Sequence, residues 1–217
     1  MAHLLHIDAS PRGERSHSRK YSGEFVRAWR VAHPDDTVTV RDIGRHPLIH
    51  VTEDWVAAAF APLAQRTPQM ADALRLSDEL VDELLAADVL VVGVPMYNFG
   101  MPSGFKAYID QIIRVGRTFS FDPTDAEHPC KPLVSGKKLY VVSVSGEGGF
   151  LGGGYSAASN HLHPHLRTVF GFIGISDIDI VHVEYLMMAG DQLDKSMESA
   201  RQQIDKLVAN RRSESVP

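Results

Sequence analysis

The sequence has one cysteine, no strong excess of either charge and no long apolar run. Its 217 residues carry a net charge of −5, and the lysines and arginines are scattered. A nucleic-acid surface needs clustered positive charge, so this class of partner is not expected. Cys130 has no second cysteine with which to form an internal disulfide, which fits a reducing compartment. No apolar stretch reaches the roughly 18 residues of a membrane-spanning helix, and the opening residues lack a signal-peptide core. We therefore expect a cytoplasmic protein without a membrane partner.

Two common nucleotide-binding motifs are also missing. No glycine-rich loop ends in Lys-Ser or Lys-Thr, and no GxGxxG turn follows a predicted strand. The first apolar run is followed instead by ASPRGERSHSRK, residues 9–20, which we call the serine loop. Serine hydroxyls and the free N–H groups of a helix N-terminus suit a mononucleotide phosphate held without metal. Simple capping of the helix by Ser16 or Ser18 explains the same pattern equally well.

Five apolar or β-branched runs alternate with helical patterns along the chain. The predicted strands are residues 3–8, 37–43, 88–95, 138–145 and 175–185. Leucine and valine recur with a period of roughly 3.6 residues over 70–87, which predicts a helix. Alternating strands and helices form a parallel sheet covered on both faces. We therefore predict one α/β domain over residues 1–217, a doubly wound five-stranded parallel sheet with helices on both faces. Its ligand site is expected beyond the carboxyl ends of the strands.

Two more loops are expected at that edge of the sheet. PMYNFGMPSGFKAYID, residues 95–110, puts aromatic and amide side chains where a polar turn would suffice. We expect Gly100 and Pro102 to fix this turn and a helix to begin near Ser103. SVSGEGGFLGGGY, residues 143–155, is rich in glycine, which lets a flat ligand lie against main-chain N–H groups. A flexible connection without a ligand is the alternative for this second loop.

Together these motifs resemble the FMN-dependent NADH:quinone oxidoreductases, also called azoreductases, a flavodoxin-like family. The resemblance rests on SPRGERSHS, on AADVLVVGVPMYNFGMPSGFKAYIDQIIRVGRTFSF and on HLRTVFGFIGISDIDIVHVE, and extends from His3 to about Met188. It implies FMN as the cofactor, NADH or NADPH as the electron donor, and quinones or azo compounds as the substrates of a homodimer. The chemistry would take place at FMN N5, so no catalytic side chain is expected.

The resemblance also implies which residues form the site. In this family the serine loop binds the FMN phosphate, the MYNF stretch contacts the isoalloxazine ring, and the loop after the fourth strand approaches the pyrimidine edge. The residues at these positions are Ser10, Ser16, His17, Ser18, Met96, Tyr97, Asn98, Phe99, Val144, Ser145, Gly146 and Glu147. The implied substrate pocket contains Asn98, Phe99, Phe121 and Phe172, although an isolated phenylalanine more often packs in a core. The fourth-strand loop lacks the arginine of the family's Ser-Arg-Gly-Gly.

Other interpretations stay open at this stage. The chain could be a non-catalytic electron carrier of the flavodoxin type, for which its modest acidity gives weak support. It could also be a flavodoxin-like module that has lost the cofactor, as the altered fourth-strand loop would allow. His161 and His165 have a spacing that could share a metal ion, but Pro164 should interrupt the helix between them, so no metal site is predicted. Lys106 and Asp110 are typical of an ion pair within a helix.

Overall fold

The computed structural model describes residues 1–214, and the side chains up to residue 210. Within this range a five-stranded parallel sheet has the order β2-β1-β3-β6-β7. Its strands are β1 (His3–Asp8), β2 (Thr37–Asp42), β3 (Val89–Pro95), β6 (Lys138–Val144) and β7 (Asp177–Val183). The predicted strands and the parallel arrangement are therefore confirmed, with bounds that differ by no more than two residues at either end.

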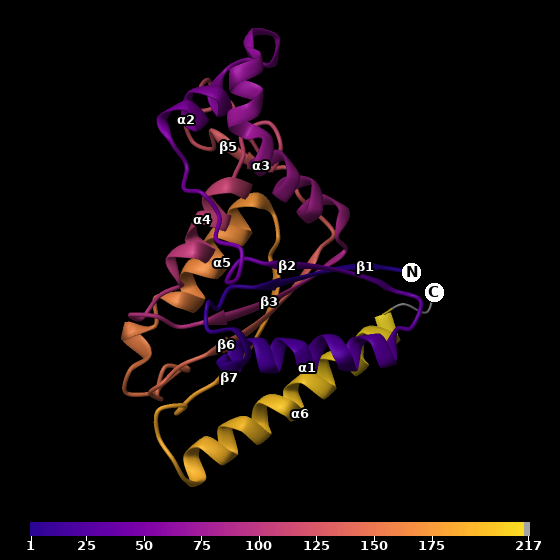
Figure 1. Ribbon diagram of the computed structural model, residues 1–217, viewed down its shortest axis with the longest axis vertical. Helices are drawn as coiled ribbons and strands as arrows, with labels where there is room; N and C mark the ends of the chain where they lie inside the picture. The colour runs from indigo at the N-terminus through magenta and orange to yellow at the C-terminus, as the bar shows by residue number, and fades with distance from the viewer. Residues whose placement is uncertain (215–217) are drawn as a thin grey trace.

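Helices cover both faces of this sheet (Figure 1). One face carries α1 (His17–Ala32) and α6 (Asp191–Glu214), which lie side by side; the other carries α3 (Pro68–Ala86), α4 (Ser103–Ile112) and α5 (Leu162–Ile173). Side chains alternate between the faces along a strand. In β1, Leu4 packs in the core with Phe25 of α1, whereas Leu5 packs in the opposite core with Leu80 of α3. Every residue of β3 is buried, as burial on both faces requires.

Local sequence explains where the helices begin and end. The Thr67 hydroxyl accepts a hydrogen bond from the Met70 N–H, and Pro68 occupies the first position of α3, where its missing N–H costs nothing. The helix therefore begins two residues before the predicted range. Gly174 directly follows the last residue of α5. Its φ of 109° terminates that helix. As expected, α4 begins at Ser103, and Lys106 pairs with Asp110 at 2.5 Å within it.

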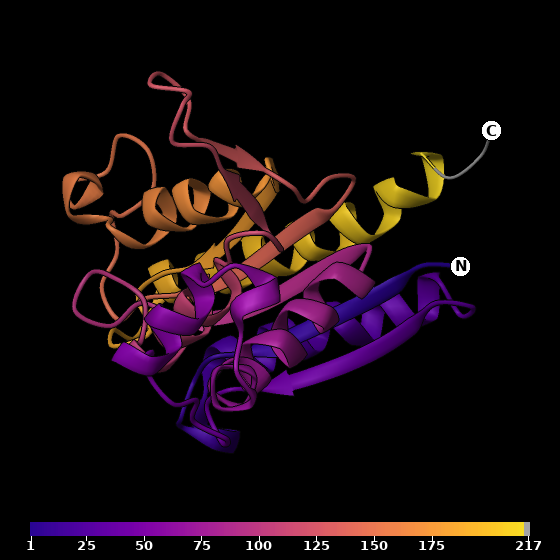
Figure 2. The same cartoon turned by 90° about the horizontal axis from the view of Figure 1, so that it is seen from above.

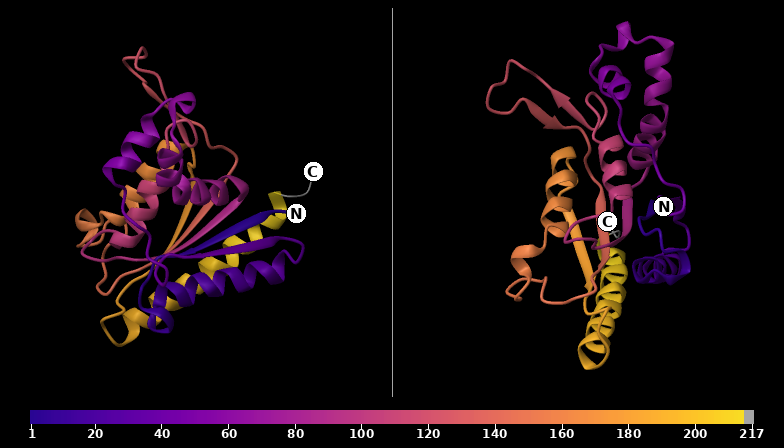
Figure 3. Two further views of the ribbon diagram at one scale, coloured as in Figure 1. Left: turned by 45° about the horizontal axis from the view of Figure 1, so that its top comes forward. Right: turned by 60° about the vertical axis from the view of Figure 1, so that its left-hand side comes forward.

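Several short elements were not predicted. The antiparallel pair β4 (Phe119–Phe121) and β5 (Cys130–Pro132) projects away from the main sheet (Figures 2 and 3). A short helix, α2 (Glu53–Phe60), packs against α3, and single 3₁₀ turns occur at Gly13–Arg15, Leu63–Gln65 and Ala157–Ser159. Among residues 1–214, no helix combines the length and the apolar composition needed to cross a bilayer.

The expectation that Pro164 interrupts a helix is wrong. The helix α5 begins at Leu162 and continues through Pro164. Proline is tolerated there because the first turn of a helix has N–H groups without intrahelical acceptors. His161 is the residue that precedes the helix, and His165 is exposed. Within the described residues, no group of three or more His, Cys, Asp or Glu side chains is placed to hold a metal ion.

Candidate functional site

A cavity of about 360 Å³ lies at the edge of the sheet that the sequence predicted. It is bordered by segments that follow β1, β3, β6 and β7. These segments contribute Ser10, Arg12, Ser16 and His17; Pro95, Met96 and Tyr97; Val144, Ser145 and Gly146; and Leu186 and Met187. After β1 the polypeptide continues to β2, which lies on one side of β1 in the sheet. The next strand, β3, pairs with the opposite side of β1. The connections therefore diverge at this point and leave a crevice at the carboxyl ends of the strands.

The N-terminus of α1 forms one end of the cavity. The Ser16 hydroxyl caps the helix by accepting a hydrogen bond from the Arg19 N–H at 3.3 Å, and it lies 3.1 Å from the Ser18 hydroxyl. The His17 and Ser18 N–H groups have no preceding helical carbonyl to bind. Among the described residues, the buried His17 Nδ1 also has no hydrogen-bond partner. Burial, with help from Lys20 and Arg12, lowers the pKa of His17. This end of the cavity is suited to an anion.

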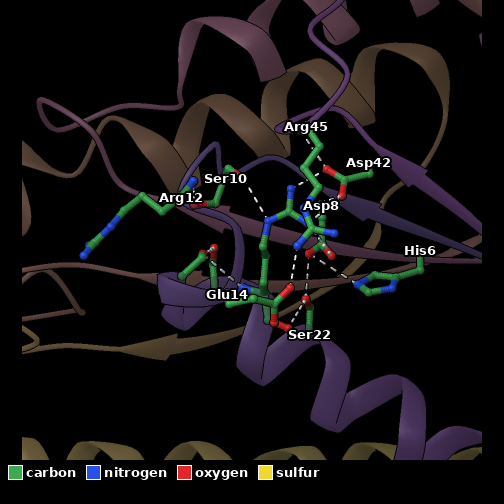
Figure 4. A network of polar contacts seen from close by, with 11 residues as sticks. His6, Asp8, Ser10, Arg12, Glu14, Ser22, Asp42 and Arg45 are labelled. Carbon is green, nitrogen blue, oxygen red and sulfur yellow. Dashed lines mark hydrogen bonds and ion pairs between the residues drawn. The ribbon is translucent and has the colours of Figure 1, made fainter.

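An ion cluster behind the serine loop fixes the course of its backbone. The Arg19 Nε donates to the Ser10 carbonyl at 2.9 Å, and the same guanidinium binds the Asp42 carboxylate through both Nη atoms. Asp8 lies 3.5 Å from this guanidinium and accepts a 2.9 Å hydrogen bond from the Ser22 hydroxyl. Figure 4 shows Asp8, Asp42 and Ser22 close to one another at one side of Ser10. The hydrogen bonds to Asp42 raise the pKa of Arg19, so its guanidinium stays charged. These contacts fix the shape of the serine loop.

The turn after β3 adopts an unusual backbone conformation. Tyr97 and Gly100 exchange two backbone hydrogen bonds, at 2.9 and 3.0 Å. Between them, Asn98 has a φ of 47° and Phe99 a φ of 68°, so both residues are left-handed. Gly100 takes part in this turn through both hydrogen bonds, but the left-handed residues are the two before it. A left-handed conformation costs a non-glycine residue about 1–2 kcal/mol. Such strain often marks a functional site. The Phe99 side chain in this turn is half exposed.

The loop after β6, residues 145–150, is joined to the segment after β7; we call it the β6 loop. The Leu186 N–H donates to the Ser145 carbonyl at 3.1 Å, and the Met187 N–H donates to the Gly146 carbonyl at 2.9 Å. A Cβ atom on Gly148 would lie 2.0 Å from the Tyr185 ring, so only glycine allows this approach. These bonds bring Leu186 and Met187 to the cavity, which the sequence analysis missed. The rule that ligands bind where strands end would have indicated this segment too, because it follows β7.

Comparison with known proteins shows similarity over nearly the whole chain. A family model described as flavodoxin-like fold matches residues 2–208. An FMN-dependent NADH:quinone oxidoreductase of Nostoc punctiforme is 51% identical over 209 residues, which cover 96% of this chain and 99% of that protein. The chain belongs to the FMN-dependent NADH:quinone oxidoreductase family.

Other members of the quinone oxidoreductase family and solved structures agree with this. An FMN-dependent NAD(P)H:quinone oxidoreductase of Pseudomonas aeruginosa is 46% identical over 205 residues, which cover 94% of this chain and 97% of that protein. The crystal structure of an azoreductase from Bacillus anthracis superposes with a TM-score of 0.84 at 25% identity, covering 96% of this chain and 99% of that one. The flavodoxin-like fold expected from the resemblance is therefore confirmed.

The cavity brings together most, but not all, of the residues that the quinone oxidoreductase resemblance implied. Those that line it are Ser10, Ser16, His17, Met96, Tyr97, Val144, Ser145 and Gly146. Ser18 is buried beside Ser16, and Glu147 contributes a backbone carbonyl to the Ser145 hydroxyl at 2.7 Å. The lining does not include Asn98, Phe99, Phe121 or Phe172. Phe121 lies on β4, and the Phe172 ring centroid is 5.0 Å from that of Phe119. Arg12 was missed, although it belongs to the serine loop.

Proposed function

We propose that this chain binds FMN in the cavity and uses it to pass two electrons from NADH or NADPH to quinones and to aromatic azo compounds. The observation that carries the proposal is the polarity of the cavity, because its two ends suit the two ends of this cofactor. Hydroxyls, helix N–H groups and the unpartnered His17 ring nitrogen lie at one end. The other end offers Met96, Tyr97 and the backbone of the β6 loop. Relatives over the full chain length carry FMN and quinone in their names.

The proposed roles of the residues follow from their positions. Ser10, Ser16 and His17 would hold the phosphate, with the positive end of the α1 dipole adding to the attraction. Met96 and Tyr97 would lie against one side of the isoalloxazine ring, and the N–H groups of the β6 loop would face its polar edge. FMN supplies the hydride acceptor and the two-electron donor when it is bound. The chain itself binds and orients the reactants and excludes water, so it needs no nucleophilic side chain.

A spectrum and a turnover assay test this function. Purified protein, or protein reconstituted with FMN, should show flavin absorbance and should oxidise NADH or NADPH in the presence of a benzoquinone. The same preparation should bleach an aromatic azo dye. Colourless protein that cannot be reconstituted would contradict both the enzyme and the electron carrier. Yellow protein that oxidises neither nucleotide would support the carrier instead.

We also propose that the chain works as a cytoplasmic homodimer. Half-exposed aromatic side chains at Phe99, Phe121 and Phe172 support this assembly, since a partner surface would cover them and could complete the substrate pocket. Light scattering on the purified protein measures its mass directly. A mass of one chain at micromolar concentration would contradict the homodimer and leave the cofactor proposal intact.

A further inference from the structure

A chain of buried polar side chains connects α5 to the β6 loop. Asn160 Nδ2 lies 2.9 Å from His163 Nδ1, and His163 Nε2 lies 2.9 Å from the Ser143 hydroxyl. The Ser143 hydroxyl lies 2.7 Å from His182 Nδ1, and His182 Nε2 lies 3.1 Å from the Ser145 hydroxyl. These side chains come from three separate parts of the sequence, and all of them are buried. The proposed function gives no role to either histidine.

We call Asn160, His163, Ser143, His182 and Ser145 the histidine chain. In its first half, from Asn160 to Ser143, each hydrogen bond has only one possible donor. Asn160 Oδ1 accepts from the His163 backbone N–H at 3.0 Å, and Asn160 Nδ2 faces the Phe150 carbonyl at 3.1 Å. The Asn160 amide therefore cannot be reversed, and its N–H group donates to His163 Nδ1. A neutral imidazole that accepts at one nitrogen donates from the other. His163 Nε2 consequently donates to the Ser143 hydroxyl.

The second half is fixed independently from its other end. The Ser145 oxygen lies 2.7 Å from the Glu147 carbonyl, which can only accept. The Ser145 hydroxyl must therefore donate to this carbonyl and accept from His182 Nε2–H. His182 Nδ1 then accepts, and Ser143 donates to it. The two halves agree at Ser143, which accepts from one histidine and donates to the other. Every member is satisfied when both rings are neutral.

From this geometry we propose that His182 is a positioning residue for the β6 loop, holding Ser145 and the Glu147 carbonyl in the conformation that binds the flavin. The proposal rests on the proposed function of the cavity. Ser145 lines the cavity, whereas His182 and His163 do not, so His182 can affect a ligand only through the loop. Partners of this kind, which hold the groups that bind a ligand, often matter nearly as much as those groups.

The β6 loop is also held at its last residue, Phe150, by Glu184 and by Asn160 of the histidine chain. The Phe150 N–H donates to Glu184 Oε1 at 2.7 Å, and the Phe150 carbonyl accepts from Asn160. The loop is thus held at Ser145 through His182 and at Phe150 through Asn160 and Glu184. The histidine chain thus supplies one of the two attachments that hold this loop. Burial lowers the pKa of both histidines, which agrees with the neutral rings that the geometry requires.

Three variants of His182 test the link. H182F keeps a ring of similar size but removes both hydrogen bonds. H182Q restores a donor at the position of Nε2, whereas H182N keeps an acceptor for Ser143 but cannot reach Ser145. S77A is the matched control, because Ser77 is a fully buried hydroxyl that binds the Gln111 carbonyl and Arg114 far from the cavity. H182N carries the test if H182F does not fold.

Two readouts are needed, and one of them requires no cofactor. FMN affinity of the apoprotein is measured by quenching of flavin fluorescence, and hydrogen exchange at amides 146–150 is measured in the free protein. We expect H182F and H182N to weaken FMN binding and to accelerate exchange by roughly tenfold each. H182Q should stay near the wild type in both, as should S77A.

Wild-type affinity and exchange in H182F and H182N would overturn the positioning role. A loss in H182Q as large as that in H182F would overturn it too, because the donor to Ser145 would then be irrelevant. Failure of the wild type to bind FMN would instead contradict the proposed function. In that case the exchange measurement on the free protein still decides whether His182 fixes the loop.

Discussion

In the turn beside the cavity, two residues adopt a left-handed backbone conformation that is usually found only in glycine. Asn98 and Phe99 are both left-handed, and the Phe99 carbonyl accepts a hydrogen bond from the His161 N–H at 3.0 Å. The half-exposed Phe99 ring has a tilted contact with Phe150, at 6.3 Å between ring centroids, so we expect its side chain to contribute little to stability. We propose instead that this ring contacts a planar substrate.

Replacing Phe99 by glycine and by alanine separates the backbone from the ring. Both variants lose the aromatic surface, so we expect the KM for a benzoquinone to rise by a similar factor in each. Only glycine relieves the left-handed strain, and F99G should therefore be more stable than F99A by about 1 kcal/mol. Urea denaturation gives the stabilities and steady-state kinetics give KM. Equal stabilities would show that the turn is not strained in solution.

At the scale of a single element, the N-terminus of α1 begins a helix and also borders the cavity. Ser16 caps the helix, while the neighbouring N–H groups and the His17 ring remain available. The sequence alone could not separate capping from phosphate binding, because serine suits both. In the structure Ser16 caps the helix and also lines the cavity, so a variant that preserves the cap and changes the charge tests whether it also binds phosphate.

S16D is that variant. Aspartate is as good a cap as serine and is favoured by the helix dipole, so the helix should keep its stability. Its carboxylate would repel the FMN phosphate, and we expect FMN affinity to fall roughly 10- to 100-fold while riboflavin, which has no phosphate, is less affected. T52D makes the same change at the cap of α2 and should bind FMN like the wild type. Equal losses for FMN and riboflavin would place the phosphate elsewhere.

The elements differ in how well the sequence predicted them. The run 88–95 is apolar throughout because β3 is buried on both faces, and its assignment needed no tertiary information. The three-residue strands β4 and β5 are too short to produce a period. The histidine chain was missed for another reason: His163 and His182 meet only when α5 packs beside β7. The spacing in HLHPH pointed to His161 and His165, whereas the buried histidine of this segment is His163 between them.

At the scale of the whole molecule, burial of two neutral histidines links folding to pH. Burial, with a smaller contribution from Arg167, lowers the pKa of His163 to about 4. Burial and then His163 lower the pKa of His182 to about 3. In the unfolded chain the pKa of both should lie near 6.5, the ordinary value of a histidine side chain. Below that pH the unfolded state therefore binds protons that the native state excludes, and the free energy of unfolding falls as the pH falls towards the native pKa values.

We expect each histidine to contribute a loss on the order of 2 kcal/mol between pH 7 and pH 5. Urea denaturation at these two pH values measures the loss in the wild type and in H182F. Because the variant lacks one of the two groups, its loss should be smaller by about 2 kcal/mol, whatever the other titrating groups contribute. Parallel pH profiles would contradict the burial of a neutral His182.

The fixed direction of the histidine chain also decides what it can carry. Passing a proton along a row of hydroxyls and imidazoles reverses every hydrogen bond in that row. Here one end is an Asn160 amide held by two backbone groups, and the other is the Glu147 carbonyl. Neither group can exchange roles, so the row is closed to proton conduction at both ends. The row can therefore hold the β6 loop in position, but it cannot conduct a proton to the cavity.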